Sequence, residues 1–310
     1  MNSAGTRLAR VNGTARTTLA LAVSLALLVA AALVGVDAPQ AHAAGLDSAC
    51  GTPLSAAEVD TVVELSDTTT LTGTVMEQLE QAVANHGRIV EILAEHRDRR
   101  GVFAIGLDAI EQAAVMPLQR AEAAFDDPDW SHRISLELLS RFLRNLHAEF
   151  SGGATEPHWA HYFALTKQCL LSPALVAMAG YNAHLSIDLS LSVAALRGTP
   201  ANGPDYFRIV DAIAIEGFRI VEVTKAVYGG DLGPLWRFYF LGEGLDAVLG
   251  AGVATGPLLR VADAGANVVI FGNGLALRDP ALAPAVRAEM DLLWRSADAA
   301  FEVLAALGGL

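Results

Sequence analysis

The residues best suited to chemistry lie in one apolar segment, 181–189, in which Asn182, His184 and Asp188 are polar. Burying such groups is unfavourable unless they are paired. His184 and Asp188 are four residues apart, so on an α-helix they share one face, about 40° apart, whereas Asn182 points elsewhere. This spacing predicts either two ligands of one metal ion or a carboxylate that holds the imidazole in one tautomer.

Two functions follow from this pattern. The first is a metal-assisted hydrolase of esters or phosphoesters, in which a divalent ion lowers the pKa of a bound water. There His184 and Asp188 are metal ligands or acid and base, and Asn182 orients the reacting groups. The second is a non-enzymatic ligand-binding or scaffolding protein, in which the same three residues form a structural polar network. A hydrolase needs a further His, Asp or Glu near His184 in a cleft open to water, while a scaffold needs the pair enclosed and fully hydrogen-bonded.

A metal site also needs three or four ligands, and the other histidines and acidic residues have no diagnostic spacing. The available residues are His132, His147, His158, His161, Asp126, Asp127 and Asp129. His158 and His161 are three apart on one expected helix, which is compatible with metal binding. Trp159 and Tyr162 beside them are equally typical of a helix-packing surface. The cofactor therefore stays open, with a divalent metal as the one candidate.

The elements that must position these residues are helices, because apolar residues recur at steps of three and four from residue 59 onward. The long apolar segment 174–196 is expected to be a central helix that other helices surround. Helix-start signals occur at 126–130, at Pro157 and at Pro173. Further helices are expected over 56–125, 131–150, 206–228, 236–249, 258–271 and 281–307. The sequence predicts an all-α fold, a single multi-helix bundle over 44–310, with no strand alternation.

Charge and composition limit the partners. The 310-residue chain has 21 Lys and Arg against 34 Asp and Glu, a formal net charge of −13, and it is 53% hydrophobic. Its largest basic cluster is Arg97, Arg99 and Arg100, so we expect no nucleic-acid partner. Charged residues interrupt the apolar last third, which argues against a stable membrane span there. That third could supply a pocket for a small-molecule or lipid-like ligand. The sequence does not indicate an oligomeric state.

Residues 1–43 resemble an export segment. A stretch with three arginines precedes an apolar run over 19–36, and the small residues at 41–43 offer a cleavage site before Ala44. We therefore expect a cleaved signal peptide and a secreted or extracytoplasmic protein. The alternative is an N-terminal membrane anchor, because about 18 apolar residues approach the length of a membrane span.

Export bears on the two cysteines, Cys50 and Cys169. An oxidising compartment favours a disulfide between them, which would close a long loop. The alternative is a pair of separate buried thiols.

Several short motifs together resemble the DUF5995 family, a bacterial domain family of unknown function. They are the segments 99–104 (RRGVFA), 127–130 (DPDW), 182–184 (NAH), 188–189 (DL) and 205–208 (DYFR). The NAH-x-x-x-DL core is the most specific of them. Ser190 stands where a proline tends to follow in the family. The resemblance covers most of residues 85–220 and implies a mostly helical domain. It also favours a functional role for His184 and Asp188, but it implies no activity, substrate or cofactor.

Overall fold

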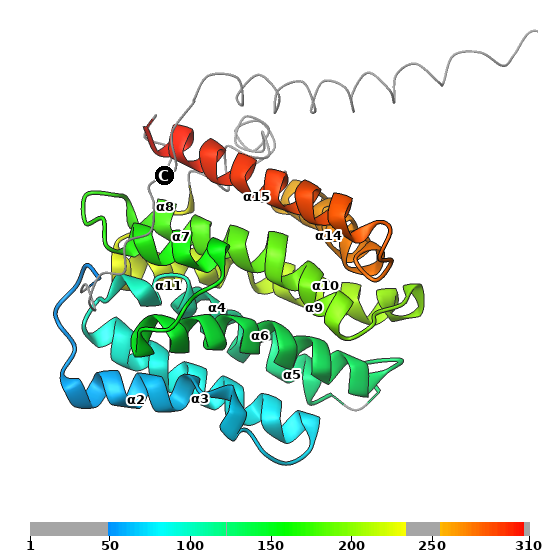
Figure 1. The fold of residues 1–310 in the computed structure, drawn as a ribbon, viewed down its shortest axis with the longest axis horizontal. Helices are drawn as coiled ribbons and strands as arrows, with labels where there is room; N and C mark the ends of the chain where they lie inside the picture. Colours follow the sequence, from blue (N-terminus) through cyan, green and yellow to red (C-terminus); the bar gives the residue numbers. More distant parts are fainter. Residues whose placement is uncertain (1–48, 122, 234–254, 307–310) are drawn as a thin grey trace, which may run out of the picture. The chain divides into compact units, whose positions relative to one another are not determined.

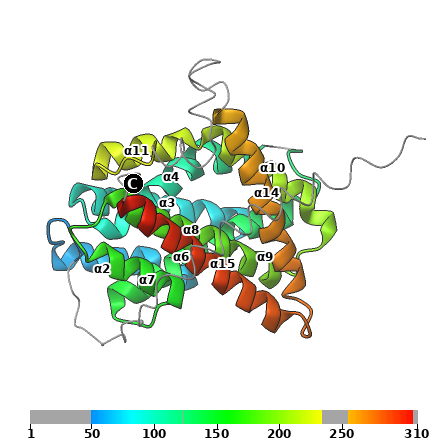
Figure 2. The same ribbon diagram turned by 90° about the horizontal axis from the view of Figure 1, so that it is seen from above.

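The computed structural model describes residues 49–121, 123–233 and 255–306, with the backbone alone for 255–264, and every regular element in these ranges is helical (Figures 1 and 2). The all-α class is thus confirmed. Residues 44–310 cluster as one unit, and the export segment predicted for 1–43 lies outside the described residues. The α-helices are α2 (Ala56–Ser66), α3 (Val75–Glu95), α4 (Ala104–Ile110), α5 (Met116–Gln119), α6 (Pro128–Ser151), α7 (Pro157–Thr166), α8 (Pro173–Asn182), α9 (Ser190–Ala195), α10 (Gly203–Glu216), α11 (Phe218–Tyr228), α14 (Thr255–Ala276) and α15 (Ala283–Ala306).

A continuous helical rod occupies the middle of these elements. It consists of α8, the π-helical stretch η4 (Ala183–Leu189) and α9. η4 contacts α6, α7, α14 and α15, while α8 packs on α15 and α9 on α14. Figure 1 shows α6 on one side of this rod and α15 on the other. The predicted central helix over 174–196 is present, but its middle is π-helical rather than α-helical.

Helix starts follow the signals in the sequence. α6 begins at Pro128, and the Asp127 side chain accepts a hydrogen bond from the Trp130 amide. α8 begins at Pro173 behind Ser172, whose hydroxyl accepts from the backbone N–H of Ala174. Each cap satisfies an amide that has no partner within its helix.

One expected helix is two. The segment predicted as a single helix over 206–228 is divided at Gly217 into α10 and α11. Glycine lowers helix propensity by about 1 kcal/mol relative to alanine, which makes it a favourable place for a break. The helices expected over 258–271 and 281–307 correspond to α14 and α15, and the one expected over 236–249 lies outside the described residues.

The core beside the rod is aromatic. The ring centroids of Phe103 and Phe142 are 5.0 Å apart, and those of Phe142 and Trp159 are also 5.0 Å apart. All three side chains are buried. α8 can approach this cluster closely because Gly180 has no side chain, and a Cβ there would collide with Phe103. Tight aromatic packing of this kind fixes where the rod lies.

One helical stretch among the described residues, Arg99–Gln119, is long and apolar enough to cross a membrane by length and composition alone. It is 61% buried inside the protein, and a core helix passes the same test.

The two cysteines form a disulfide, as predicted. Cys50 and Cys169 are joined across 119 residues of sequence, with their Cα atoms 5.4 Å apart. Arg99 supports this junction, because its amide donates to the Cys50 carbonyl and its guanidinium donates to the carbonyls of Cys169 and Leu171. Disulfides form and persist in oxidising compartments outside the cytoplasm, which is the environment this bond indicates.

We predict that removing the disulfide destabilises the protein by about 3–5 kcal/mol, because the bond restricts a long loop of the unfolded chain. A Cys50→Ser/Cys169→Ser double variant should lose this amount in urea unfolding. The oxidised wild type should show no free thiol when titrated under denaturing, non-reducing conditions. Two titratable thiols, or equal stability of the two proteins, would contradict the assignment.

Candidate functional site

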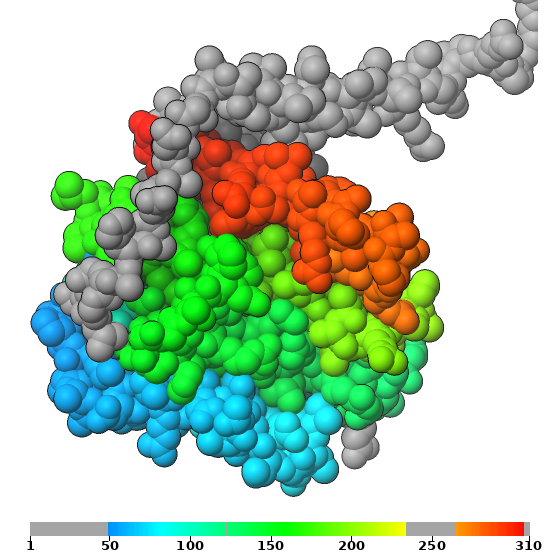
Figure 3. All heavy atoms as spheres, in the orientation of Figure 1, coloured from blue at the N-terminus to red at the C-terminus, as the bar shows by residue number. Residues whose placement is uncertain are grey.

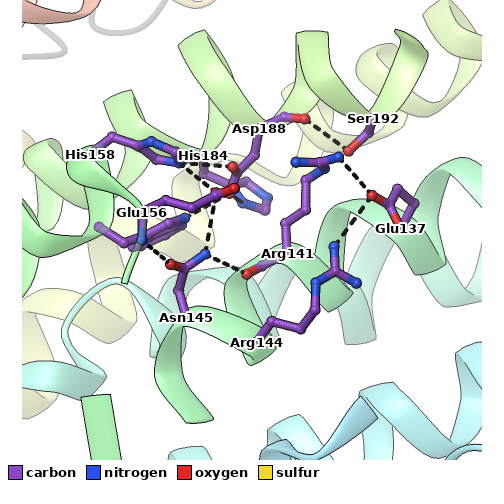
Figure 4. A network of polar contacts seen from close by, with 10 residues as sticks. Glu137, Arg141, Arg144, Asn145, Glu156, His158, His184, Asp188 and Ser192 are labelled. Carbon is purple, nitrogen blue, oxygen red and sulfur yellow. Dashed lines mark hydrogen bonds and ion pairs between the residues drawn. The ribbon is translucent and has the colours of Figure 1, made fainter. Parts of the chain in front are cut away.

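Asp188 is a fully buried carboxylate whose partners come from α7. Its Oδ1 lies 2.9 Å from His158 Nε2, and its Oδ2 accepts a 2.8 Å hydrogen bond from Trp159 Nε1. His184 Nδ1 is 4.0 Å from Oδ2, beyond hydrogen-bond distance. Figure 4 shows His158 and Asp188 pointing toward each other. The structure therefore places His158, rather than His184, as the imidazole paired with Asp188.

His184 is buried without a polar partner at one ring nitrogen. It is 4% exposed, and the described residues offer no hydrogen bond to Nδ1. Its ring packs against Phe103, with the centroids 5.1 Å apart. Burial, with the neighbouring His86 and His158, lowers the pKa of His184 to about 3. The imidazole is therefore neutral at physiological pH.

His184 lines a cavity of about 140 Å³. Of its 20 lining residues, 14 are Leu, Ile or Val, supplied chiefly by α3, α4, α6, α10 and η4. The polar side chains in the wall are those of Glu111, Ser135, Tyr181, His184, Tyr206 and Asn267. The cavity is thus a largely aliphatic chamber with a small number of polar groups, which is the usual composition of a small-molecule site.

Glu111 belongs to a second buried pair, which the sequence analysis missed. His86 Nδ1 lies 2.6 Å from Glu111 Oε2, and both residues are at least 95% buried. Burial raises the pKa of Glu111. Burial also opposes the charge of His86, but the Glu111 carboxylate outweighs it and raises the pKa of His86. The 2.6 Å contact is a short hydrogen bond between the two side chains.

A signal for this pair is present in the sequence. His86 stands on the apolar stripe of α3, between Val83 and Val90, where a polar residue needs a buried partner. Its partner lies 25 residues away, and no local spacing indicates it. Three-dimensional packing alone joins the two.

Two of the polar residues that line the cavity, Glu111 and His184, lie in π-helical stretches. Glu111 begins η3 (Glu111–Val115), and His184 and Asp188 lie in η4. Short π-helical turns within α-helices are rare and occur frequently at functional sites. Their i→i+5 hydrogen bonds widen the turn, so the α-helical angle assumed for His184 and Asp188 does not apply.

Asn182 is directed away from His184. Its Nδ2 donates to the Trp294 carbonyl and to Asp298 Oδ1, each at 2.8 Å, and its Oδ1 accepts from the Ser186 hydroxyl. Burial raises the pKa of Asp298 to about 7 despite the hydrogen bond from Asn182. Asn182 therefore connects the central rod to α15, which matches the structural role considered for it.

The remaining residues considered from sequence have other neighbours. Asp127 caps α6, His132 Nε2 lies 3.1 Å from the Gln119 carbonyl, and His147 Nδ1 lies 3.0 Å from the Val63 carbonyl. His161 Nε2 is 3.4 Å from Asp298 Oδ2. The structure does not bring them together with His184.

Two groups of His and acidic residues in the described ranges are compact enough to hold a metal ion. One is His86, Asp108 and Glu111, and the other is Glu156, His158 and Asp188. Neither contains His184. The expected pair of metal ligands is therefore divided, with Asp188 in one cluster and His184 at the cavity.

Together these features define an all-helical protein with two buried histidine–carboxylate pairs and an aliphatic cavity, which Glu111 of one pair lines. Residues 74–229 match the model of a family described as a family of unknown function, DUF5995. The match spans half of the chain, and the protein belongs to this family, as its motifs predicted. No curated protein and no solved structure matches the chain.

The depressed pKa of His184 gives a prediction about acid stability. Its folded pKa, about 3, lies below the ordinary value of 6.5, so the unfolded chain binds the proton more tightly between these values. This contribution to stability is present above pH 6.5 and is lost as pH falls toward 3. Between pH 7 and pH 4 it amounts to about 3 kcal/mol.

His184→Gln and His184→Leu cannot take up this proton. We expect both variants to lose about 3 kcal/mol less than the wild type between pH 7 and pH 4 in urea unfolding. Parallel pH profiles for wild type and both variants would show that His184 is not buried in its neutral form.

Proposed function

We propose that this protein binds small, largely apolar molecules that carry one uncharged polar group, and that they occupy the cavity beside His184. The observation that carries the proposal is the cavity itself, an aliphatic chamber whose wall includes a neutral imidazole. This is the ligand-binding alternative considered from sequence, with one change. His184 contacts the ligand instead of belonging to the structural polar network, while Asp188 and Asn182 join the central rod to α7 and α15.

The cavity volume limits the size of the ligand. Engineered cavities of about 150 Å³ with a similar aliphatic lining stay dry and take up molecules the size of benzene. A chamber of about 140 Å³ therefore suits a single ring or a short alkyl chain.

Charge limits the polar group of the ligand. His184 is neutral, and the cavity-lining Glu111 is hydrogen-bonded to His86. The polar side chains in the wall therefore offer no unpaired charge to offset a ligand carboxylate or ammonium, whose burial is costly. A phenol, alcohol or amide can instead exchange a hydrogen bond with the imidazole at little desolvation cost.

A metal-assisted hydrolase centred on His184 and Asp188 stays a prediction. The geometry supports it less well, because His184 Nδ1 lies 4.0 Å from Asp188 Oδ2 and neither compact ligand cluster includes His184. A reaction at His184 also lacks an efficient base, since a group with a pKa of about 3 accepts protons poorly at neutral pH.

We also propose that the protein acts outside the cytoplasm after cleavage of residues 1–43. The charge and apolar pattern of that segment and the disulfide between Cys50 and Cys169 support this location. The acidic net charge supports the expectation that nucleic acid is not a partner.

Calorimetric titration with p-cresol and p-xylene tests the cavity. Wild type should bind both, and p-cresol about fivefold more tightly, because its hydroxyl adds one net hydrogen bond of about 1 kcal/mol. His184→Leu should remove the preference for p-cresol and keep p-xylene binding. Val83→Phe, which fills the cavity, should abolish both.

The matched control is Ile215→Phe, because Ile215 is an exposed aliphatic residue on α10 outside the cavity. It should bind both compounds as the wild type does. Absence of binding to wild type, or unchanged binding to Val83→Phe, would contradict the proposed function.

For the location, we expect the intact mass of the exported protein to correspond to a chain that begins at Ala44. Expression of the full chain in a bacterium, followed by fractionation and mass spectrometry, measures this. An uncleaved chain in the membrane fraction would instead establish the N-terminal anchor.

A further inference from the structure

The cluster on the α7 side of η4 has the composition of a metal site. It contains one imidazole and two carboxylates, from Glu156, His158 and Asp188. His158 Nε2 lies 2.9 Å from Asp188 Oδ1 and 3.4 Å from Glu156 Oε2, and the three ligand atoms all lie within 4.8 Å of one another. Figure 4 shows the three side chains converging.

We propose that Glu156, His158 and Asp188 bind a divalent transition-metal cation, with Zn²⁺ as the best match. Zn²⁺ bonds to nitrogen and oxygen ligands are about 2.0–2.2 Å long, so tetrahedral ligands lie about 3.3–3.6 Å apart. The observed separations from His158 Nε2 differ from these by a few tenths of an ångström. Small side-chain rotations therefore suffice for an ion to replace the proton between His158 and Asp188.

Neighbouring side chains already orient both carboxylates. Trp159 Nε1 donates to Asp188 Oδ2, which leaves Oδ1 directed at the imidazole. Asn145 Oδ1 accepts from the Glu156 amide at 2.7 Å, and Asn145 Nδ2 is 3.4 Å from Glu156 Oε2. Such outer contacts around metal ligands fix their orientation and raise metal affinity.

The cluster is also accessible from one side. The Glu156 side chain is 45% exposed, whereas those of His158 and Asp188 are 6% and 0% exposed. We therefore expect an ion to enter past Glu156 and water to complete its coordination. Three protein ligands with one open position are typical of catalytic rather than structural zinc sites.

The second cluster, His86, Asp108 and Glu111, fits less well. His86 and Glu111 are both buried, and their direct contact of 2.6 Å leaves little room between the two ligand atoms. Asp108 also lies 3.3 Å from the Gln112 side-chain amide. We therefore assign the cation to the cluster with Glu156.

The test uses the full purified chain without an affinity tag, stripped with a chelator and titrated calorimetrically with ZnCl₂. We expect one equivalent of Zn²⁺ to bind and the midpoint of thermal unfolding to rise, because the ion binds only the folded protein. Glu156→Gln should weaken Zn²⁺ binding at least tenfold. It changes a half-exposed residue and keeps an oxygen toward Asn145, so folding should be unaffected by circular dichroism.

His158→Asn provides the second variant, with His161→Asn as its control on the same helix. His158→Asn should bind Zn²⁺ at least tenfold more weakly, and His161→Asn as tightly as the wild type. Absence of Zn²⁺ binding to the wild type overturns the proposal, as does unchanged affinity in Glu156→Gln. Loss of binding in Glu111→Gln alone would overturn it by assigning the ion to the other cluster. Unchanged p-cresol binding in Glu156→Gln separates this site from the cavity.

Discussion

The buried carboxylate of Asp188 is the constraint on which the site depends. An ionised carboxylate with no exposure to water is costly unless donors reach both oxygens, and here His158 and Trp159 do so from α7. These two bonds attach α7 to the central rod. They also remove Asp188 from the reach of His184, whose Nδ1 is 4.0 Å away. Asp188 is therefore paired with α7, whereas His184 in the same helical stretch lines the cavity.

The π-helical stretches explain how polar residues enter an aliphatic wall. In η3 and η4 the wider turn changes the direction of the side chains relative to an uninterrupted α-helix. Glu111 and His184 reach the same cavity from these two stretches. The imidazole of His184 is neutral, and the Glu111 carboxyl is hydrogen-bonded to His86 rather than left unpaired. A chamber of this kind selects for shape and for one hydrogen bond rather than for charge.

The family motifs have identifiable structural roles. Phe103, from the segment 99–104, packs its ring 5.1 Å from that of His184. Asp205 accepts hydrogen bonds from the amides of Asp126 and Asp127, which holds the loop before α6 against α10. Ser190, at the position where a proline tends to occur in the family, is buried and donates to the Ile270 carbonyl, and the rod continues through it as α9. The family motifs thus include residues that pack the helices together as well as residues at the candidate site.

The sequence by itself determined the all-α class, most helix starts, the apolar central rod, the cysteine pair and the family, because these follow from local periodicity, caps, residue counts and short motifs. Only the tertiary structure decided which polar groups meet. His158 was one of several histidines without a diagnostic spacing, and His86 and Glu111 were not singled out, since their partners lie 25 to 30 residues away in sequence. The π-helical turns were also hidden, because an α-helix and a π-helix present the same apolar pattern over so few residues. Local sequence specifies which helices form, whereas the pairing of buried charges depends on how those helices pack.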